Sequence, residues 1–228
     1  MAKLFNLVVC DPPWSFSDKL RQSKTKRGAA SQYKTMTDDR IITMGIEKIA
    51  AKDSLIALWV PSSKLQTGMD CLKAWGFTQK QTWIWVKVKN QPLKELNKRI
   101  RKDKKPQKTI DLKDVYSYIN DFDINETLGF GMGRIGRNVH ELVLIGVKGS
   151  ISKKIKNKSQ RTVFFAPISK HSAKPEILQE RLEIIFPKSK KIEIFARRER
   201  KGWTVIGNEC PATKGQDIYD SLNNLIRK

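Results

Sequence analysis

Short apolar runs and helical stripes of apolar residues follow one another along the chain. The apolar runs predict buried strands at residues 4–10, 54–60, 81–88, 142–147, 162–166, 192–197 and 203–209. Apolar positions at helical spacing predict helices over residues 37–49, 62–75, 175–186 and 218–226. Because strands alternate with helices, the pattern predicts an α/β fold with a largely parallel, doubly wound sheet.

One stretch departs from this alternation. Residues 89–128 begin with a strongly basic segment and continue with a small, weakly helical piece, which indicates an insertion. The sequence contains no internal repeat and no second hydrophobic core set apart by a linker. Its 228 residues are therefore expected to form a single domain, 1–228, that carries the basic insertion.

Charge changes the expectation about partners. The chain has 45 Lys+Arg against 23 Asp+Glu, a formal net charge of +22. Such an excess predicts attraction to a polyanion, most simply nucleic acid. Basic segments at 15–34, 89–108 and 150–161 are candidates for phosphate contacts, and each has the alternative of a solvated face. In the second segment, we expect Lys102, Lys104 and Lys105 to bind substrate.

The cysteines, histidines and apolar runs bear on compartment and metal content. Cys10, Cys71 and Cys210 are far apart and odd in number, which favours a reducing compartment. The two histidines, His140 and His171, stand alone, so no metal site is predicted. No apolar run has transmembrane length and the N-terminus lacks a signal-peptide pattern, so we expect a cytoplasmic protein without a membrane partner.

The first predicted strand ends in Asp11-Pro12-Pro13-Trp14. A carboxylate at the carboxyl end of a buried strand lies where α/β sheets bind ligands. Two prolines hold the next backbone carbonyls in fixed directions, and Trp14 offers a flat face to a base. Carboxylate, carbonyl and aromatic face together suit an exocyclic amine on a planar ring. The alternative is a strand followed by a Pro-Pro turn and a core tryptophan.

Adenine carries such an amine. Its lone pair is delocalised into the ring, so the nitrogen is a poor nucleophile, but it has two N–H donors. The Asp11 carboxylate and the Pro12 carbonyl could accept both hydrogens and stabilise the positive charge that grows on the nitrogen during attack. Holding a methyl donor in line would supply most of the remaining rate enhancement.

Five sequence blocks occur in an order that is typical of one family. They are Asp11–Trp14; Tyr33–Asp38; Leu58–Val60 with Trp85–Lys87; Asn138–Gly149; and Ser172–Pro175 with Ile192–Arg197 and Gly207–Glu209. On these blocks the chain resembles the adenine N6-methyltransferase family typified by the catalytic subunit of the messenger-RNA N6-methyladenosine writer, in its phage and bacterial DNA-modifying type. The similarity runs from about Leu7 to Glu209, apart from the insertion.

The resemblance implies a Rossmann-like methyltransferase fold with permuted order, catalytic motif first and S-adenosylmethionine-binding segment last. It implies that the catalytic residues are Asp11, Pro12, Pro13 and Trp14. It places Tyr33 and Glu141 near the substrate base. It implies that S-adenosylmethionine is bound by Asp11, Lys174, Phe195, Arg197, Asn208 and Glu209.

Two features depart from the family pattern. Family members usually carry a segment before the catalytic strand that contributes an acidic cofactor contact, and here only residues 1–5 precede it. After Arg197, the family often has a His-Asn pair, where this chain has Arg198-Glu199-Arg200. Glu199 could accept hydrogen bonds from the ribose hydroxyls in their place.

The expected function is therefore S-adenosylmethionine-dependent N6-methylation of adenine in DNA. DNA is favoured because the chain is compact, has no appended RNA-binding module and resembles phage and bacterial members. Two alternatives are the same reaction on RNA and a catalytically silent nucleic-acid-binding subunit of a methyltransferase complex. The protein is expected in a bacterial or phage-infected cell, as a homo- or heterodimer if it pairs.

Overall fold

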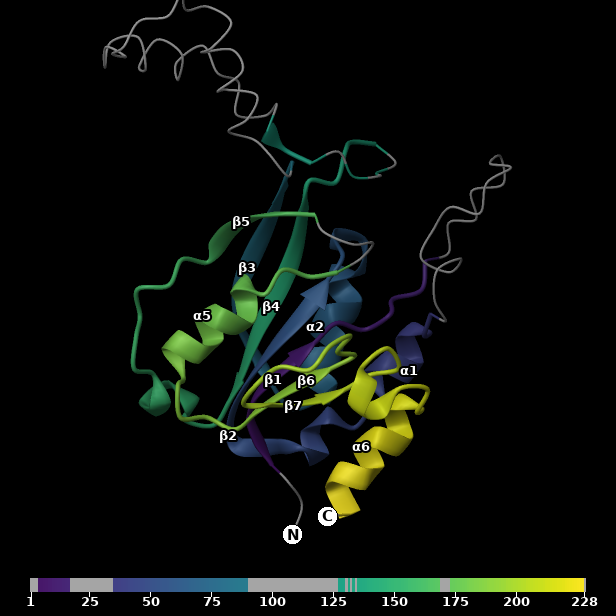
Figure 1. Ribbon diagram of the computed structural model, residues 1–228, viewed down its shortest axis with the longest axis vertical. Coiled ribbons are helices and arrows are strands. Elements are labelled where there is room, and N and C mark those ends of the chain that lie inside the picture. The colour runs from purple at the N-terminus through teal and green to yellow at the C-terminus, as the bar shows by residue number, and fades with distance from the viewer. Residues whose placement is uncertain are drawn as a thin grey trace, which may run out of the picture. The chain divides into compact units, whose positions relative to one another are not determined.

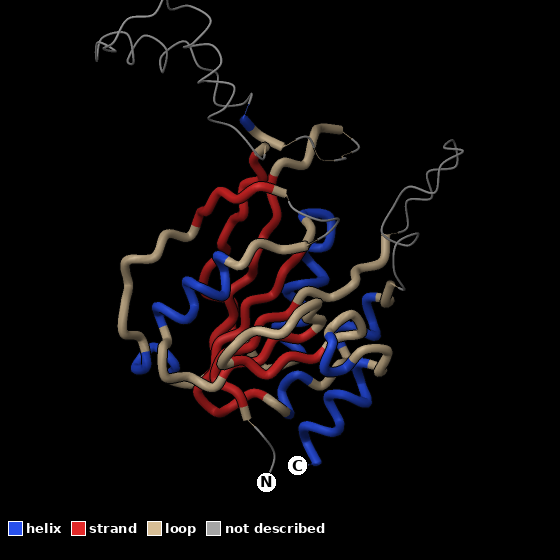
Figure 2. The backbone as a smooth tube through the Cα atoms, viewed as in Figure 1, coloured by secondary structure: helices blue, strands red, loops and turns tan. Residues whose placement is uncertain are grey.

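The computed structural model describes residues 4–16, 35–89, 127–129, 131, 133, 135–168 and 173–227. Within these residues, seven strands form a sheet in the order β5-β3-β4-β2-β1-β6-β7 (Figure 1). The strands are β1 (Phe5–Cys10), β2 (Ala50–Val60), β3 (Thr78–Val88), β4 (His140–Lys148), β5 (Val163–Pro167), β6 (Lys191–Ile194) and β7 (Trp203–Ile206). Figure 2 shows the strands in red with helices and loops around them.

The sheet is mixed, and its direction matters for the site. β1 runs parallel to β2 and to β6, and β6 runs parallel to β7. β3 runs parallel to β5, whereas β4 is antiparallel to β2. Because β1, β6 and β7 are adjacent and parallel, their carboxyl ends meet at one edge of the sheet. The predicted α/β fold with a largely parallel sheet is confirmed; the permuted order remains a prediction.

The α-helices of the described residues are α1 (Asp38–Ile42), α2 (Leu65–Ala74), α5 (Ile177–Ile185) and α6 (Ile218–Arg227). The predicted helix over residues 37–49 is wrong in extent. Thr37 takes the N-cap position, but α1 ends at Ile42 and only a single 3₁₀ turn, η2 (Ile46–Lys48), follows. Gly45 separates the two with a left-handed φ of 76°, a conformation that glycine adopts without steric cost.

The last two strands are shorter than predicted. β6 ends at Ile194 and β7 at Ile206, three residues before the ends that the apolar pattern indicates. β6 stops because Phe195 has a φ of 64°, which is incompatible with an extended strand. The residues that follow both strands therefore lie in turns at the carboxyl edge of the sheet.

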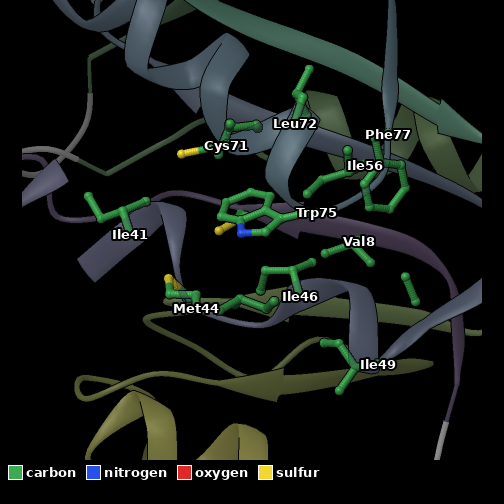
Figure 3. Close-up of a cluster of buried hydrophobic side chains, with 14 of the residues drawn as sticks. Val8, Ile41, Met44, Ile46, Ile49, Ile56, Cys71, Leu72, Trp75 and Phe77 are labelled. Carbon is green, nitrogen blue, oxygen red and sulfur yellow. The ribbon is translucent and has the colours of Figure 1, made fainter. Parts of the chain in front are cut away.

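A hydrophobic core covers one face of the sheet, against α1, α2 and α6. Figure 3 shows Trp75 within this core, with Val8 of β1 and Ile56 of β2 among its neighbours. Trp75 is fully buried, and its indole N–H donates to the carbonyl of Ile42, 2.9 Å away. This bond ties the end of α2 to the end of α1, so the short α1 is held by tertiary contacts more than by its own length.

Contacts within the chain define two compact units. The first comprises Met1–Trp83, Leu142–Thr162 and Gln179–Lys228, and the second Ile84–Glu141 and Val163–Leu178. The expectation of a single domain stays a prediction. Among the described residues, no helix is both long and apolar enough to cross a bilayer.

Candidate active site

The Asp11-Pro12-Pro13-Trp14 motif forms a tight turn directly after β1. The amide of Trp14 donates to the carbonyl of Pro12 over 2.9 Å, and the amide of Met36 donates to the carbonyl of Pro13 over 2.8 Å. These bonds fix both proline carbonyls, as the sequence predicts for a Pro-Pro backbone. Since a carbonyl oxygen has two lone pairs, the Pro12 oxygen keeps one for a further donor.

Trp14 anchors this turn in the core. Its side chain is 4% exposed, and its indole N–H donates to the carbonyl of Trp59 on β2 over 3.0 Å. A buried ring with a paired N–H holds the motif against the sheet and offers no exposed face to a base. That Trp14 shapes a base pocket stays a prediction. Its observed contacts could shape such a pocket only by holding the backbone of the turn in place.

The turn after β6 lies beside Asp11. The amide of Asp11 is 3.4 Å from the carbonyl of Ile194, so the two strand ends are adjacent. The next residue, Phe195, is the only non-glycine residue with positive φ in the part of the chain that the structure describes. Such a backbone costs about 1–2 kcal/mol and persists only where surrounding contacts enforce it, which is common at functional sites.

The turn after β7 packs against the turn after β6, backbone to backbone. The amide of Ala196 donates to the carbonyl of Ile206 over 3.0 Å. A Cβ atom at Gly207 would collide with the backbone of Ala196, so this position requires glycine. The hydroxyl of Thr213 bonds the amide and the carbonyl of Gly207, both over 2.9 Å. The two turns are thereby locked together.

Three predicted cofactor residues project from these turns. Arg197 and Glu209 form an ion pair of 3.6 Å; Arg197 is partly buried, whereas Asn208 and Glu209 are exposed. They present a guanidinium, a carboxylate and an amide at the carboxyl edge, where open α/β sheets bind ligands. This donor set fits the carboxylate, amine and hydroxyl groups of S-adenosylmethionine. The structure therefore places Asp11, Phe195 and these three residues at one edge.

A partly buried carboxyl group next to Asp11, that of Glu193, was not predicted from the sequence. Glu193 pairs with Val9 in the β1–β6 register, so Glu193 and Asp11 face the same side of the sheet. The pKa of Glu193 is raised from its ordinary value. Burial and the charge of Asp11 raise it, and a hydrogen bond from Gln179 offsets only part of that rise. Among the described residues, the buried Oε1 atom of Gln179 has no hydrogen-bond partner.

In the second unit, one carboxylate lies between two ammonium groups. Glu141 is 2.7 Å from Nζ of Lys87 and 3.3 Å from Nζ of Lys174. Burial raises the pKa of Glu141, but the charges of Lys174 and Lys87 and their hydrogen bonds outweigh it, and the pKa is lowered from 4.5. The Lys87 ammonium also lies 5.2 Å from the centre of the Trp85 ring.

Neither of these two ion pairs of Glu141 was predicted from the sequence. A signal for Lys87 was present, because Trp83, Trp85 and Lys87 alternate along β3 and therefore share one face. Lys174 and Glu141 were each predicted as site residues, and the structure brings them together. The remaining predicted site residues lie outside the described residues: Tyr33, Lys102, Lys104 and Lys105. No cluster of three potential metal ligands occurs within the described ranges.

Comparisons with known proteins identify the family. The MT-A70 family model matches residues 5–113 and 123–209. The chain is 27% identical over 210 residues to the N(6)-adenosine-methyltransferase MT-A70-like of Arabidopsis thaliana, covering 90% of this chain and 24% of that protein. It is 25% identical to the N(6)-adenosine-methyltransferase catalytic subunit METTL3 of Homo sapiens, covering 90% of this chain and 28% of that protein.

A third relative matches over four-fifths of its own length. The chain is 22% identical over 227 residues to the Type II methyltransferase M.MunI of Mycoplasma sp, covering 93% of this chain and 80% of that protein. By contrast, the chain spans about a quarter of the plant and human relatives. Because the family model covers most of the residues, including the turn after β1 and the turns after β6 and β7, the chain belongs to the MT-A70 family.

Proposed function

We propose that this protein transfers a methyl group from S-adenosylmethionine to the N6 atom of adenine in nucleic acid, with DNA as the preferred substrate. One observation carries the proposal. In a member of the MT-A70 family, a carboxylate and a fixed carbonyl, those of Asp11 and Pro12, stand at the carboxyl edge of three parallel strands. The charged and polar side chains of the neighbouring turns fit the cofactor.

Asp11 and Pro12 would bind the two hydrogens of the adenine amino group. Their oxygens draw the nitrogen toward tetrahedral geometry and stabilise its developing positive charge, and removing one such acceptor typically lowers turnover about 100-fold or more. The nitrogen lone pair would form the new bond to the methyl carbon as the bond between that carbon and the sulfonium sulfur breaks and its electron pair stays on sulfur. One N–H proton would then leave to the Asp11 carboxylate or to water. S-adenosylmethionine supplies the electrophilic methyl group.

The turns after β6 and β7 would hold the cofactor. Arg197 would pair with an anionic group, and the exposed Asn208 and Glu209 would bind hydroxyl groups. Gly207 keeps the two turns in contact, so these side chains start from a fixed backbone. Pre-organised groups of this kind lower the barrier because they need no rearrangement during the reaction.

Within the second unit, the Lys87–Glu141–Lys174 cluster could bind charged and polar groups of a ligand. Its net charge is +1, with both ammonium groups partly buried. A carboxylate of the ligand could therefore pair with Lys174, because Glu141 would keep its ion pair with Lys87. Glu141, held ionised by two lysines, remains an acceptor for an N–H donor of a base.

The preference for DNA rests on the similarity to the Type II methyltransferase M.MunI. The plant and human relatives are named N(6)-adenosine-methyltransferases, which favours RNA as the second candidate. In a duplex, the target base must leave the stack, which costs a few kcal/mol, and the net charge of +22 would offset that cost through phosphate contacts.

The test measures transfer of a labelled methyl group to duplex DNA, single-stranded DNA and RNA of the same adenine-containing sequence. Asp11→Ala is assayed alongside, and cofactor binding is measured by calorimetry. We expect label on DNA adenine, lost in Asp11→Ala while nucleic-acid affinity is retained. Label on RNA alone would overturn the DNA preference. No label and no cofactor binding would favour the silent-subunit alternative.

A further inference from the structure

The edge of the sheet opposite Asp11 has a different composition. β1 and β2 begin there, with Phe5 paired to Ala50. β4 is antiparallel to β2 and therefore ends there, with Lys148 paired to Ser54. The loop that follows β4 and the loop that precedes β6 consequently leave the sheet at this same edge, in the lower part of Figure 1.

Asp53 and Asn6 connect these loops. The amide of Ser150 donates to the Asp53 carboxylate over 2.7 Å, and the side-chain amide of Asn6 donates to the Asp53 carbonyl over 2.9 Å. The backbone of Lys190 donates to the Asn6 side chain over 3.4 Å and accepts from the amides of Asn6 and Leu7. The start of β2, the loop after β4 and the loop before β6 thus share one hydrogen-bond network.

The end of α5 belongs to the same edge. The amide of Lys156 donates to the carbonyl of Ile185 over 2.8 Å. The side chain of Lys191 reaches the carbonyl of Pro187 over 3.3 Å. A helix carboxyl end attracts cations, so this arrangement explains the place of Lys191. It does not explain the other lysines on these segments, most of which are exposed to solvent.

Eight lysines lie on these bonded segments, and we call them the lysine edge: Lys52, Lys148, Lys153, Lys154, Lys156, Lys188, Lys190 and Lys191. All are exposed except Lys148 and Lys191, which are partly buried. The one acid on these segments is Asp53, and its carboxylate already binds Ser150. Among the described residues, none of the eight ammonium groups forms a salt bridge with a carboxylate. Lys191 is bound to the carbonyl of Pro187 and its charge lowers the pKa of Glu183, so the charge available to an outside anion is that of the other seven.

We propose that the lysine edge binds the sugar–phosphate backbone of nucleic acid as a second contact, separate from the turn that holds Asp11. The choice of nucleic acid rests on the proposed function. Lysines contact phosphates as point charges without reading sequence, and these seven charges of one sign on a fixed backbone match a repeating anion. An anionic lipid surface is the competing partner.

The register of β1 and β6 sets the distance between the two contacts. Lys190 bonds Asn6 at the start of β1, and Asp11 follows Cys10 at its end, so the two lie five residues apart along the strand. At about 3.3 Å per residue, this is roughly 17 Å of backbone. A duplex covers that distance in about five base pairs of about 3.4 Å each, so one 40-base-pair duplex can contact both the Asp11 turn and the lysine edge.

The test compares wild type with Lys153→Gln/Lys154→Gln/Lys156→Gln in binding a 40-base-pair duplex over a series of salt concentrations. The slope of log K against log salt should become shallower by about 2–3, since each duplex phosphate contact contributes about 0.9. The Michaelis constant for methylation of a 40-base-pair duplex should rise roughly tenfold. The Michaelis constant for S-adenosylmethionine should stay unchanged, because the lysine edge does not contact the cofactor.

Two controls keep the result decisive. The matched variant with arginine at the same three positions keeps the charge and should retain the wild-type slope. Lys188→Gln/Lys190→Gln, on the loop before β6, should lower the slope independently. An unchanged slope in both glutamine variants would overturn the proposal. The proposal would also be overturned if the glutamine variants lost binding to vesicles that contain anionic lipid but kept the wild-type salt slope for DNA. Because binding needs no turnover, absence of methylation would refute the proposed function alone.

Discussion

The two edges of the sheet in the first unit are built on different principles. At the carboxyl edge, the groups are few, mixed in charge and held by a Pro-Pro turn, a left-handed Phe195 and the contact at Gly207. At the opposite edge, the groups are many, alike in charge and exposed, and only their backbone is fixed. Chemistry needs fixed positions for a few atoms, whereas phosphate binding needs charge density and tolerates mobile side chains.

The largest effect is expected at the carboxyl edge, from Asp11→Asn. This change keeps the shape of the side chain but removes the charge that would stabilise the reacting nitrogen, so turnover should fall about 100-fold or more. Affinity for nucleic acid should change little. The measurement is labelled methyl transfer at saturating substrate together with duplex binding.

Asp70→Asn is the matched control for this prediction. Asp70 is exposed on α2, where its carboxylate accepts a hydrogen bond from Gln66 over 3.0 Å. Removing a charge there should leave turnover within about twofold, as for most exposed surface substitutions. Equal losses in the two variants would show that Asp11 acts through the overall charge of the protein and not through its position.

The position of Asp11 could be predicted from sequence because local signals agree. An apolar run ends at two prolines, and both features mark the end of a buried strand. The same holds for Asn208 and Glu209, which follow an apolar run and belong to a recognisable block. These residues could be placed without knowing which strands are neighbours.

Features that depend on neighbouring strands could not be predicted. Glu193 alternates with Ile192 and Ile194, a pattern typical of a strand with one solvated face, yet Gln179 covers it. The left-handed backbone of Phe195 is imposed by tertiary contacts and has no signal in its own side chain. The lysine edge likewise needs the antiparallel direction of β4, since the sequence predicts basic loops without saying at which edge they lie.

A second prediction compares one glycine from each edge. Gly207→Ala forces a Cβ atom against the backbone of Ala196, and Gly149→Ala does the same against Lys52 and Asp53 at a φ of 60°. Overpacking of this kind costs about 1–3 kcal/mol in the free energy of unfolding. Urea denaturation should show such a loss in both variants, but calorimetry should show weaker S-adenosylmethionine binding only for Gly207→Ala. If both variants bound S-adenosylmethionine more weakly, the prediction that only the carboxyl edge binds the cofactor would be wrong.

A third prediction tests partly buried charge against exposed charge. Glu141→Gln leaves the ammonium groups of Lys87 and Lys174 without their partner and should cost about 1–2 kcal/mol at neutral pH. Glu209→Gln removes the exposed partner of Arg197 and should cost less than about 0.5 kcal/mol. Urea denaturation at pH 7 measures both losses. Similar losses in the two variants would contradict the prediction that the more buried ion pair contributes more to stability.

The pH dependence gives Glu141 a signature of its own. Its pKa is lowered from 4.5 in the folded protein, so its contribution to stability is present above 4.5 and is lost as the pH falls through the lowered value. The difference in unfolding free energy between wild type and Glu141→Gln should therefore be constant above that pH and shrink below it. A difference that stays constant on acidification would exclude this charge effect as its source.

The smallest effect concerns the backbone of Phe195. Phe195→Ala and Phe195→Gly remove the same partly buried ring, but only alanine keeps a Cβ atom at a φ of 64°. A left-handed conformation costs an L-residue about 1–2 kcal/mol, and glycine's extra entropy in the unfolded chain cancels about 0.5–1 kcal/mol of that difference. Phe195→Gly should therefore be more stable than Phe195→Ala by about 0.5–1 kcal/mol in urea denaturation.

This comparison separates the ring of Phe195 from its backbone. If the left-handed turn positions Arg197 for the cofactor, Phe195→Gly keeps the turn and should bind S-adenosylmethionine at least as tightly as Phe195→Ala. If the ring itself contacts the cofactor, both variants should lose affinity equally. A glycine variant less stable than the alanine variant would show that the turn is not strained, because relief of strain is the only source of the expected gain.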